Sequence, residues 1–316
     1  MKNFTYAAVK DYGQAFNESE RRGAVFLAGG TNLVDLWKLG AIAVDHAIEI
    51  NSLPMLGISA SATAGFKLGA NERMADTAAQ ADLAKHYPVI VESLFLAASP
   101  QIRNMASLGG NLMQRPRSIT YRNPDITRVD PPSRFDAIYG VSQRSAAPHP
   151  SDFAVALLAL DASVRLRDAQ GERTVKIDDF YRSPENSPEQ LTTIRPGELI
   201  VEIVGPALPW GFRSTYTKIR DRASYQFAIV SVAAALDIDG AHIRDVRLAA
   251  GGVGTRPWRL IKVEDGLRGK PASVESYQTA ANLVRGTATT HTYNAYKVPL
   301  LQNTIVRTLL KLEAMV

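Results

Sequence analysis

Two pairs of adjacent glycines have the residue types and spacing best suited to bind a ligand. The first pair belongs to Gly29-Gly30-Thr31-Asn32, which lies between a short apolar run and a helix-like segment. The second belongs to the segment 107–112, Ser-Leu-Gly-Gly-Asn-Leu, which we interpret as another glycine turn before a helix. Paired glycines permit positive φ and close backbone approach, and the amide groups of such turns bind phosphate. A pyrophosphate would suit both turns if the fold places them side by side.

Taken singly, each glycine pair is more typical of a tight turn than of a ligand site. Neither pair fits the Gly-x-Gly-x-x-Gly dinucleotide fingerprint, and no Lys-Ser or Lys-Thr follows either one as in a P-loop. A Rossmann NAD domain and a P-loop NTPase are therefore disfavoured.

The other residue types that usually carry chemistry are absent or scattered. The chain has no cysteine, which excludes thiolate nucleophiles and Cys-ligated iron–sulfur clusters. The five histidines show neither metal-ligand spacing nor a Ser-His-Asp arrangement, so we predict no metal site and no catalytic residue. His149 stands between Pro148 and Pro150, and we interpret it as a turn residue.

Charge and hydropathy exclude further classes. The net charge of +5 is spread along the chain, whereas nucleic-acid binding usually needs a concentrated basic stripe. The densest arginine segment, 115–144, is interpreted as a solvent-facing or partner-facing loop. No apolar run is long enough to span a membrane, and the first residues lack an apolar signal core. We expect a cytoplasmic protein by default, or a periplasmic one if a signal-bearing partner exports it.

The elements that position the glycine turns follow from hydrophobic spacing and from turn residues. In the first 205 residues the pattern predicts strands at 24–28, 47–50, 66–70 and 199–204, a hairpin at 163–177, and helices at 12–22, 33–39, 75–85, 88–98 and 153–160. After two prolines near 206–209 it predicts strands at 212–219, 228–238 and 243–250, then helices at 273–285 and 299–315. Residues 113–148 are rich in proline and arginine and lack periodicity, which indicates an insertion or a functional loop.

Six short motifs occur in one order along nearly the whole chain: 28–33 (AGGTNL), 68–70 (LGA), 102–112 (IRNMASLGGNL), 149–152 (HPSD), 196–200 (PGELI) and 218–225 (KIRDRASY). Together they resemble the FAD-binding medium subunits of the molybdenum hydroxylases, the family of xanthine dehydrogenase and carbon monoxide dehydrogenase. The likeness is nearest to the FAD subunits of bacterial aldehyde oxidoreductases. Each motif is modest alone, and it is the six in register that make the resemblance specific.

The resemblance implies an α+β fold with two domains. The first is a two-part FAD-binding domain of the vanillyl-alcohol-oxidase type over residues 1–205, with subdomains of about 1–55 and 56–205 and an insertion at about 113–148. The second is a smaller α+β domain of the carbon monoxide dehydrogenase flavoprotein type over 206–316.

The resemblance also implies a noncovalent FAD site. The first glycine turn would bind the pyrophosphate, and the second would complete the cradle and reach the ribityl chain. Asp152 is the candidate for the adenosine ribose, and Lys218 for a cation beside the isoalloxazine ring. Arg103 would pair with a phosphate or else close a helix. The full set of predicted cofactor-binding residues is Ala28, Gly29, Gly30, Thr31, Asn32, Leu33, Gly69, Ala70, Arg103, Ser107, Gly109, Gly110, Asn111, Asp152, Leu199 and Lys218.

By the same resemblance, the chain passes electrons to an external acceptor from [2Fe–2S] centres on an iron–sulfur subunit, while a molybdopterin-binding subunit holds the molybdenum cofactor. Relatives carry cysteines for a [4Fe–4S] cluster in the insertion, whereas Ser118 and Ser145 stand here. We therefore expect no cluster on this chain, and an insertion that is mobile or held by a partner. A structural adaptor that has lost electron transfer is the alternative, and a self-sufficient flavoprotein oxidase ranks last.

Overall fold

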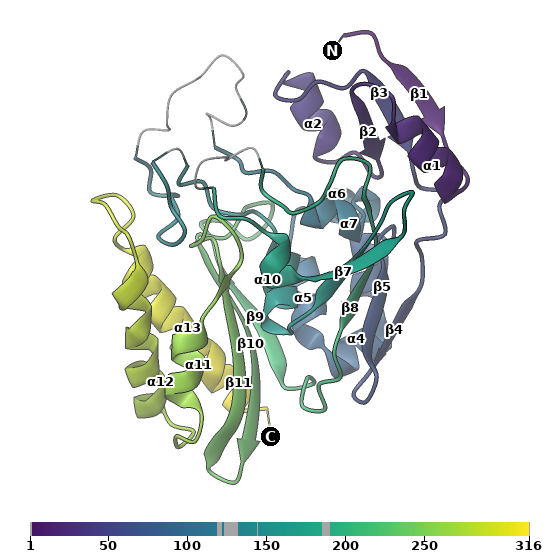
Figure 1. Ribbon diagram of the computed structural model, residues 1–316. Helices are drawn as coiled ribbons and strands as arrows, with labels where there is room; N and C mark the ends of the chain where they lie inside the picture. Colours follow the sequence, from purple (N-terminus) through teal and green to yellow (C-terminus); the bar gives the residue numbers. More distant parts are fainter. Residues whose placement is uncertain (1, 119–121, 123–131, 144, 185–189, 316) are drawn as a thin grey trace.

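The computed structural model of the chain describes residues 2–118, 122, 132–143, 145–184 and 190–315. Three sheets follow one another along the sequence, and the chain runs from a small N-terminal unit to a helical layer at the C-terminus (Figure 1). None of the described helices has the length and hydrophobicity needed to cross a membrane. The architecture confirms the predicted mixture of helices and strands.

The first sheet carries the first glycine turn. Its three parallel strands pair in the order β1-β3-β2. The strands are β1 Thr5–Ala8, β2 Ala24–Leu27 and β3 His46–Glu49, and the helices between them are α1 Tyr12–Ser19 and α2 Leu33–Lys38. The Asp11 side chain caps α1 by accepting a hydrogen bond from the Gln14 amide. Because β2 leads into α2 through the glycine pair, the turn opens at the end of this sheet.

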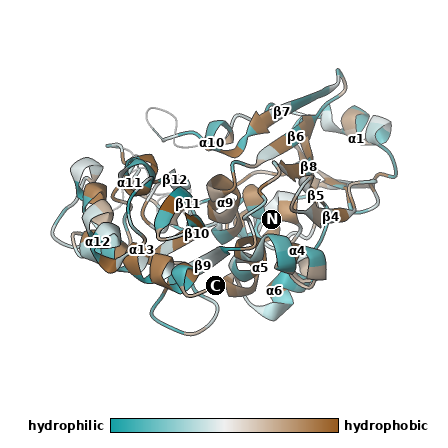
Figure 2. Ribbon diagram, turned by 90° about the horizontal axis from the view of Figure 1, so that it is seen from below, coloured by the Kyte–Doolittle hydropathy of each residue, from teal (hydrophilic) through white to brown (hydrophobic). Residues whose placement is uncertain are grey.

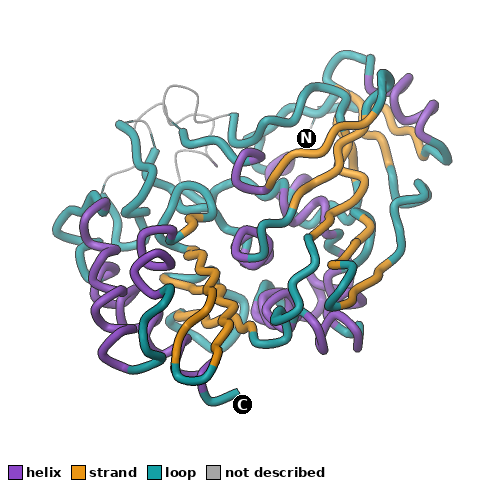
Figure 3. The backbone as a smooth tube through the Cα atoms, turned by 60° about the horizontal axis from the view of Figure 1, so that its bottom comes forward, coloured by secondary structure: helices purple, strands orange, loops and turns teal. Residues whose placement is uncertain are grey.

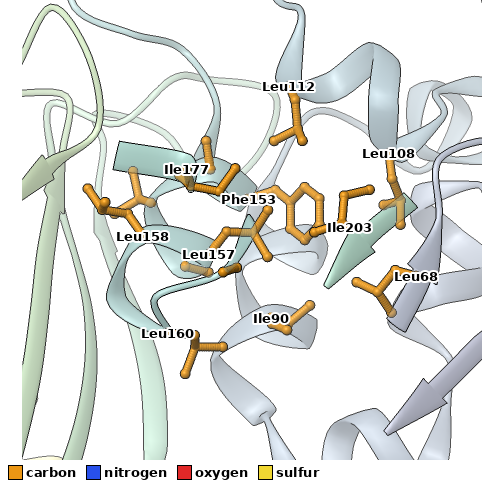
Figure 4. Packing of buried hydrophobic residues seen from close by; sticks show 14 of the residues in the cluster. Leu68, Ile90, Leu108, Leu112, Phe153, Leu157, Leu158, Leu160, Ile177 and Ile203 are labelled. Atoms are coloured by element: carbon orange, nitrogen blue, oxygen red, sulfur yellow. The ribbon is translucent and has the colours of Figure 1, made fainter. Parts of the chain in front are cut away.

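The second sheet forms the centre of the molecule. Its antiparallel strands lie in the order β4-β5-β8-β6-β7, with bounds β4 Ile58–Ser61, β5 Gly65–Gly69, β6 Ser163–Arg167, β7 Glu172–Lys176 and β8 Leu199–Gly205. The helices around it are α3 Met74–Ala78, α4 Ala81–His86, α5 Pro88–Leu96, α6 Pro100–Met105, α7 Leu108–Leu112, α9 Asp152–Ala159 and α10 Ile177–Phe180. Every residue of α9 is buried, and Figure 4 shows its Phe153 and Leu157 beside Ile203 of β8.

The third sheet is covered on both faces. Its strands pair antiparallel in the order β12-β11-β10-β9, with bounds β9 Ser214–Ile219, β10 Val230–Asp239, β11 His242–Gly251 and β12 Trp258–Arg259. On one side lie α11 Ile261–Leu267, α12 Val274–Ala281, the 3-10 helix η1 Asn282–Thr287 and α13 Lys297–Glu313. On the other side lie α5 and α9 (Figure 2).

This double burial explains the almost uninterrupted apolar sequence of β10. Side chains alternate between the two faces of a strand. Ala234 and Leu236 join the core beneath α13, whereas Ala233 and Ala235 join the core of the second sheet around α9. The C-terminal sheet is therefore packed against the preceding part of the chain.

Several predicted elements differ from the observed ones. The helix expected at 75–85 is two helices, α3 and α4, because the chain turns between them. The second glycine pair lies inside α7 and follows the helix α6, so it is not a junction between a strand and a helix. The short elements β1, β4, α6, α10 and α11 were not predicted because so few residues show no clear period.

The insertion is held in part by this chain itself. Ile138 and Tyr139 are fully buried in the core beneath α13, and the Tyr139 hydroxyl donates to the Val284 carbonyl at 2.8 Å. Lys297 Nζ, also fully buried, donates to the carbonyls of Phe135 and Gly252, each at 2.8 Å. At Phe135, Ile138 and Tyr139 the insertion therefore packs against this chain itself, while the expectation that a partner holds the insertion stays a prediction. Much of 119–131 lies outside the described residues.

Long loops gather at one end of the molecule, between the first sheet and the C-terminal helices (Figures 1 and 3). They include the first glycine turn, the described end of the insertion and the loop after β9. The candidate site lies among them.

Candidate functional site

The two glycine segments lie side by side, as a shared ligand requires. A Cβ on Gly29 would stand 1.9 Å from the carbonyl oxygen of Met105, the last residue of α6, so only glycine allows the first turn to touch the chain just before the second segment. The Gly109 amide donates to the Ala70 carbonyl at 2.9 Å, which joins the end of β5 to the same place. Three segments that are distant in sequence meet there.

A cavity of about 440 Å³, the glycine cavity, opens at this meeting point. Eleven of the sixteen predicted residues line it: Ala28, Gly29, Gly30, Thr31, Asn32, Leu33, Ala70, Ser107, Gly109, Gly110 and Leu199. It is also lined by Phe26, Ile42, Met113, Arg115 and Ile194, which sequence reasoning did not find. These five share no motif, and only the fold brings them together.

Free hydrogen-bond donors point to an anionic or polar ligand. Within the described residues, the amide groups of Thr31, Asn32 and Leu33 find no acceptor. The Asn32 side-chain nitrogen is buried and also lacks a partner, while its oxygen accepts from the Arg115 amide at 3.3 Å. Gly30, at φ +70°, gives the turn its shape. Because buried polar groups normally are hydrogen-bonded, these donors fit the oxygens of a pyrophosphate.

The second glycine segment contributes differently from the prediction. Three of its amides are already taken: Leu108 donates to the Glu72 carbonyl, Gly109 to the Ala70 carbonyl, and Gly110 to the hydroxyl of Ser107, the N-cap of α7. The donors of the site therefore come from the first turn. The glycines of the second segment form a wall that a ligand can approach closely.

A second cavity of about 580 Å³, the middle cavity, adjoins the first and shares Thr31, Asn32 and Gly110 with it. Asn111 and Asp152 line it, together with residues of the loop after β9. Two of the three non-glycine residues with positive φ in the described chain, Ala98 (φ 49°) and Tyr225 (φ 53°), are in this lining. Such strain gathers at functional sites. Ala98 is a lining residue that the sequence reasoning did not single out.

A buried ion pair lies beside the middle cavity. Lys218 Nζ stands 2.6 Å from Asp152 Oδ2, with side-chain exposures of 1% and 5%. The same ammonium donates to the Leu96 carbonyl, and the Tyr216 hydroxyl donates to Asp152 Oδ1 at 2.7 Å. Burial, and then the neighbouring Asp152 charge, raises the pKa of Tyr216 well above its usual value. The pair is thus built from the start of α9 and from β9.

Asp152, predicted to contact the adenosine ribose, and Leu199, another predicted cofactor-binding residue, lie in different cavities. Asp152 lines the middle cavity, whereas Leu199 lines the glycine cavity, on the other side of the first glycine turn. Lys218 is in contact with Asp152, so both belong to the same end of the site.

Besides Lys218, which lies behind Asp152, two predicted residues lie outside the cavity walls. Gly69 is packed behind Ala70, where a Cβ would stand 2.4 Å from the Met55 carbonyl oxygen. The Arg103 guanidinium donates to the Ala97 carbonyl at 2.8 Å and lines neither cavity. Its position matches the structural alternative, in which it closes a helix.

A third cavity of about 540 Å³, the proline cavity, continues from the middle one and takes its name from Pro132, Pro148 and Pro150 in its lining. His149 lines it and is buried; burial lowers the pKa of this imidazole to about 3, so the ring is neutral. The His149 Nδ1 atom accepts from the Ser151 amide at 3.3 Å. His149 is a buried turn residue, in line with the interpretation of the sequence.

Comparison with known proteins decides the family. The model of the FAD binding domain in molybdopterin dehydrogenase matches residues 2–208, and that of the CO dehydrogenase flavoprotein C-terminal domain matches 214–312. The chain belongs to the FAD-binding medium subunits of the molybdenum hydroxylases. The resemblance drawn from the six motifs is confirmed.

Relatives of this FAD-binding subunit are components of oxidoreductase complexes. It is 40% identical over 273 residues to the aldehyde oxidoreductase FAD-binding subunit PaoB of Escherichia coli, covering 82% of this chain and 84% of that one. It is 30% identical over 258 residues to the glyceraldehyde dehydrogenase medium chain of Sulfolobus acidocaldarius, covering 82% and 78%.

The fold of the subunit has solved counterparts. A chain of carbon monoxide dehydrogenase from Hydrogenophaga pseudoflava superposes with a TM-score of 0.78 at 23% identity, over 99% of this chain and 98% of that one. A chain of reconstituted CO dehydrogenase from Oligotropha carboxidovorans gives 0.80 at 20% identity, over 100% and 99%. The α+β fold expected from the resemblance is confirmed.

Proposed function

We propose that this subunit binds FAD noncovalently and passes electrons from iron–sulfur centres on a partner subunit to an external acceptor. The flavin supplies the redox chemistry, and the protein supplies binding, orientation and electrostatics. We further propose an FAD-binding domain over residues 1–205, with subdomains of about 1–55 and 56–205, and a C-terminal domain over 206–316.

The free donors of the first glycine turn carry this proposal. The amides of Thr31, Asn32 and Leu33, with the buried Asn32 side-chain nitrogen, would hold the pyrophosphate at the junction of the glycine and middle cavities. The adenosine would then occupy the glycine cavity toward Leu199. The isoalloxazine ring would occupy the middle cavity.

The buried pair beside the middle cavity suggests how the chain holds the ring end of the cofactor. Because the Asp152 carboxylate compensates the charge of the Lys218 ammonium, the main effect of this ammonium is to hold the groups that it contacts. Lys218 fixes the Asp152 carboxylate, and with Arg220 it donates to the Leu96 carbonyl, next to the strained Ala98. We therefore propose that Lys218 positions two parts of the middle cavity wall: Asp152 directly, and Ala98 through the Leu96 carbonyl two residues before it.

The relatives' names support the partner assignment. The words subunit and medium chain describe components of larger assemblies. We propose an iron–sulfur subunit and a molybdopterin-binding subunit as partners, which carry [2Fe–2S] clusters and the molybdenum cofactor. The first glycine turn contains no His or Cys to which a flavin could be attached covalently.

The test is a visible absorption spectrum of the purified full chain, with the released chromophore identified by chromatography. We expect about one FAD per chain. Gly30→Val should lose the flavin, because Gly30 has positive φ and a Cβ there would press on Val34 and Leu27. Gly240→Val is the matched control, since Gly240 also has positive φ but faces open space in the β10–β11 turn.

Two results would contradict the proposal. A folded, colourless chain that takes up no added FAD would leave the structural adaptor as the better description. Equal flavin content in the two glycine variants would show that the cofactor does not lie against the first glycine turn.

A further inference from the structure

The proline cavity and the middle cavity share one wall. Asp152, Gln226, Phe227, Pro150 and Arg117 line both. The proline cavity has about 540 Å³ of space, within the range of small-molecule sites. If the flavin ring occupies the middle cavity, as proposed above, a molecule in the proline cavity lies next to it.

The charged groups that line the proline cavity already have partners within the described chain. Arg117 pairs with Asp35 at 3.1 Å, and Asp136 with the imidazole of His291 at 3.0 Å. Asp152 pairs with Lys218. What faces the space is then mainly the apolar surface of Phe135, Phe227, Val155 and Ala228, together with the prolines. This chemistry suits an uncharged, largely apolar ligand.

The same observations separate the classes of electron acceptor. A dinucleotide such as NAD is held most strongly through its phosphates by free cations, and the one cationic side chain among the described lining residues, Arg117, already pairs with Asp35. Molecular oxygen needs no enclosed space of this size. A flat, uncharged quinone needs apolar and aromatic walls, which Phe135 and Phe227 supply.

We propose that the proline cavity is the binding site for a quinone that reoxidises the flavin. The inference rests on the proposed function. Reoxidation would transfer two electrons and one proton from the anionic reduced flavin to the quinone, which would take its second proton from the solvent. The products would be the hydroquinone and the oxidised flavin.

The binding test titrates the full chain with 2-methyl-1,4-naphthoquinone by isothermal calorimetry, with and without FAD. We expect one site per chain in the FAD-loaded protein. Ala228→Phe should fill the cavity and weaken binding tenfold or more, because Ala228 lines it. Ala241→Phe, in the exposed β10–β11 turn, is the matched control and should bind like the parent chain. Phe227→Ala, which removes an aromatic wall from a half-exposed position, is a second variant and should also weaken binding.

The redox test follows reoxidation of the photoreduced flavin by stopped flow. The rate with the naphthoquinone should saturate with concentration and fall tenfold or more in Ala228→Phe. Ferricyanide, which needs no apolar site, should reoxidise both proteins at the same rate. This comparison separates a lost quinone site from a damaged flavin site.

Several outcomes would overturn the proposal. Quinone binding equal in the parent and both cavity variants would show that the cavity is not the site. Binding only to the FAD-free chain would mean that the flavin itself fills the cavity. Reoxidation by NAD⁺ at a saturating rate would assign another acceptor. A chain that binds the quinone but no FAD would instead contradict the proposed function.

Discussion

Lys218 of β9 and Asp152 at the start of α9 form an ion pair of 2.6 Å in the interior, beside two adjoining cavities. Taking two charges out of water is costly, and further hydrogen bonds are needed to offset the cost. Here the Leu96 carbonyl and the Tyr216 hydroxyl provide them. The pair therefore links the C-terminal sheet to the FAD-binding region.

Breaking this pair should destabilise the protein strongly. Lys218→Met leaves Asp152 buried without its cation, and we expect a loss of about 3 kcal/mol in the free energy of unfolding. The double variant Lys218→Met/Asp152→Asn should recover at least about 1 kcal/mol of that loss, measured by urea unfolding. Lys311→Met is the control: Lys311 pairs with Glu92 at a half-exposed site, and its loss should stay within about 1 kcal/mol. A double variant no more stable than Lys218→Met would contradict the coupling.

A methyl group on Gly29 should separate the two glycine segments. Its Cβ would overlap the Met105 carbonyl oxygen, and overpacking of this kind costs about 1–3 kcal/mol. We expect Gly29→Ala to lose that much stability and to bind FAD more weakly, measured by thermal unfolding and by flavin fluorescence titration. Gly286→Ala, where a Cβ meets open space, should change stability by no more than about 0.5 kcal/mol.

Acidification should destabilise the folded chain through His149. Burial lowers the pKa of His149 from 6.5 to about 3 in the folded state. Between these values the unfolded chain binds one more proton, so this contribution to stability is complete above pH 6.5 and decreases as the pH falls. Urea unfolding at pH 6.5 and 5.0 should show a drop about 1.5–2 kcal/mol larger in the parent than in His149→Gln. Parallel pH profiles would show that the imidazole is not held neutral.

Relieving the strained turn beside the middle cavity should stabilise the protein. Ala98 has φ 49°, a conformation that costs an L-residue about 1 kcal/mol and glycine almost nothing. We expect Ala98→Gly to raise the free energy of unfolding by up to about 1 kcal/mol. Ala97→Gly, at a residue with φ −82°, is the matched control and should lower it by a similar amount. A loss of stability in Ala98→Gly would contradict the strain.

The sequence alone was sufficient to identify the family and nearly half of the residues that line one cavity. The segment Gly29-Gly30-Thr31-Asn32 is local: its glycines, its donors and the helix that follows are contiguous, so short-range rules describe it. The helices at 153–160 and 299–315 were also predictable, because apolar side chains recur with helical spacing or in one buried run.

Tertiary structure decided what the second glycine segment does. The sequence shows a Gly-Gly pair twice. Only the fold shows that Ala70, Glu72 and Ser107 accept hydrogen bonds from three amides of the second segment. The run of three successive free amides, Thr31 to Leu33, therefore belongs to the first turn. Hydrogen bonds between distant segments leave no periodic trace in the sequence.

The roles of Asp152, Lys218 and the insertion were likewise decided by packing. Asp152 and Lys218 are 66 residues apart, and their partnership depends on α9 covering the C-terminal sheet. The end of the insertion looks like a loop in sequence, but Ile138, Tyr139 and Lys297 bury it against that sheet. Local sequence determined the glycine turn and the main helices of this protein, whereas long-range burial and hydrogen bonding determined where its cavities lie and which hydrogen-bond donors remain free.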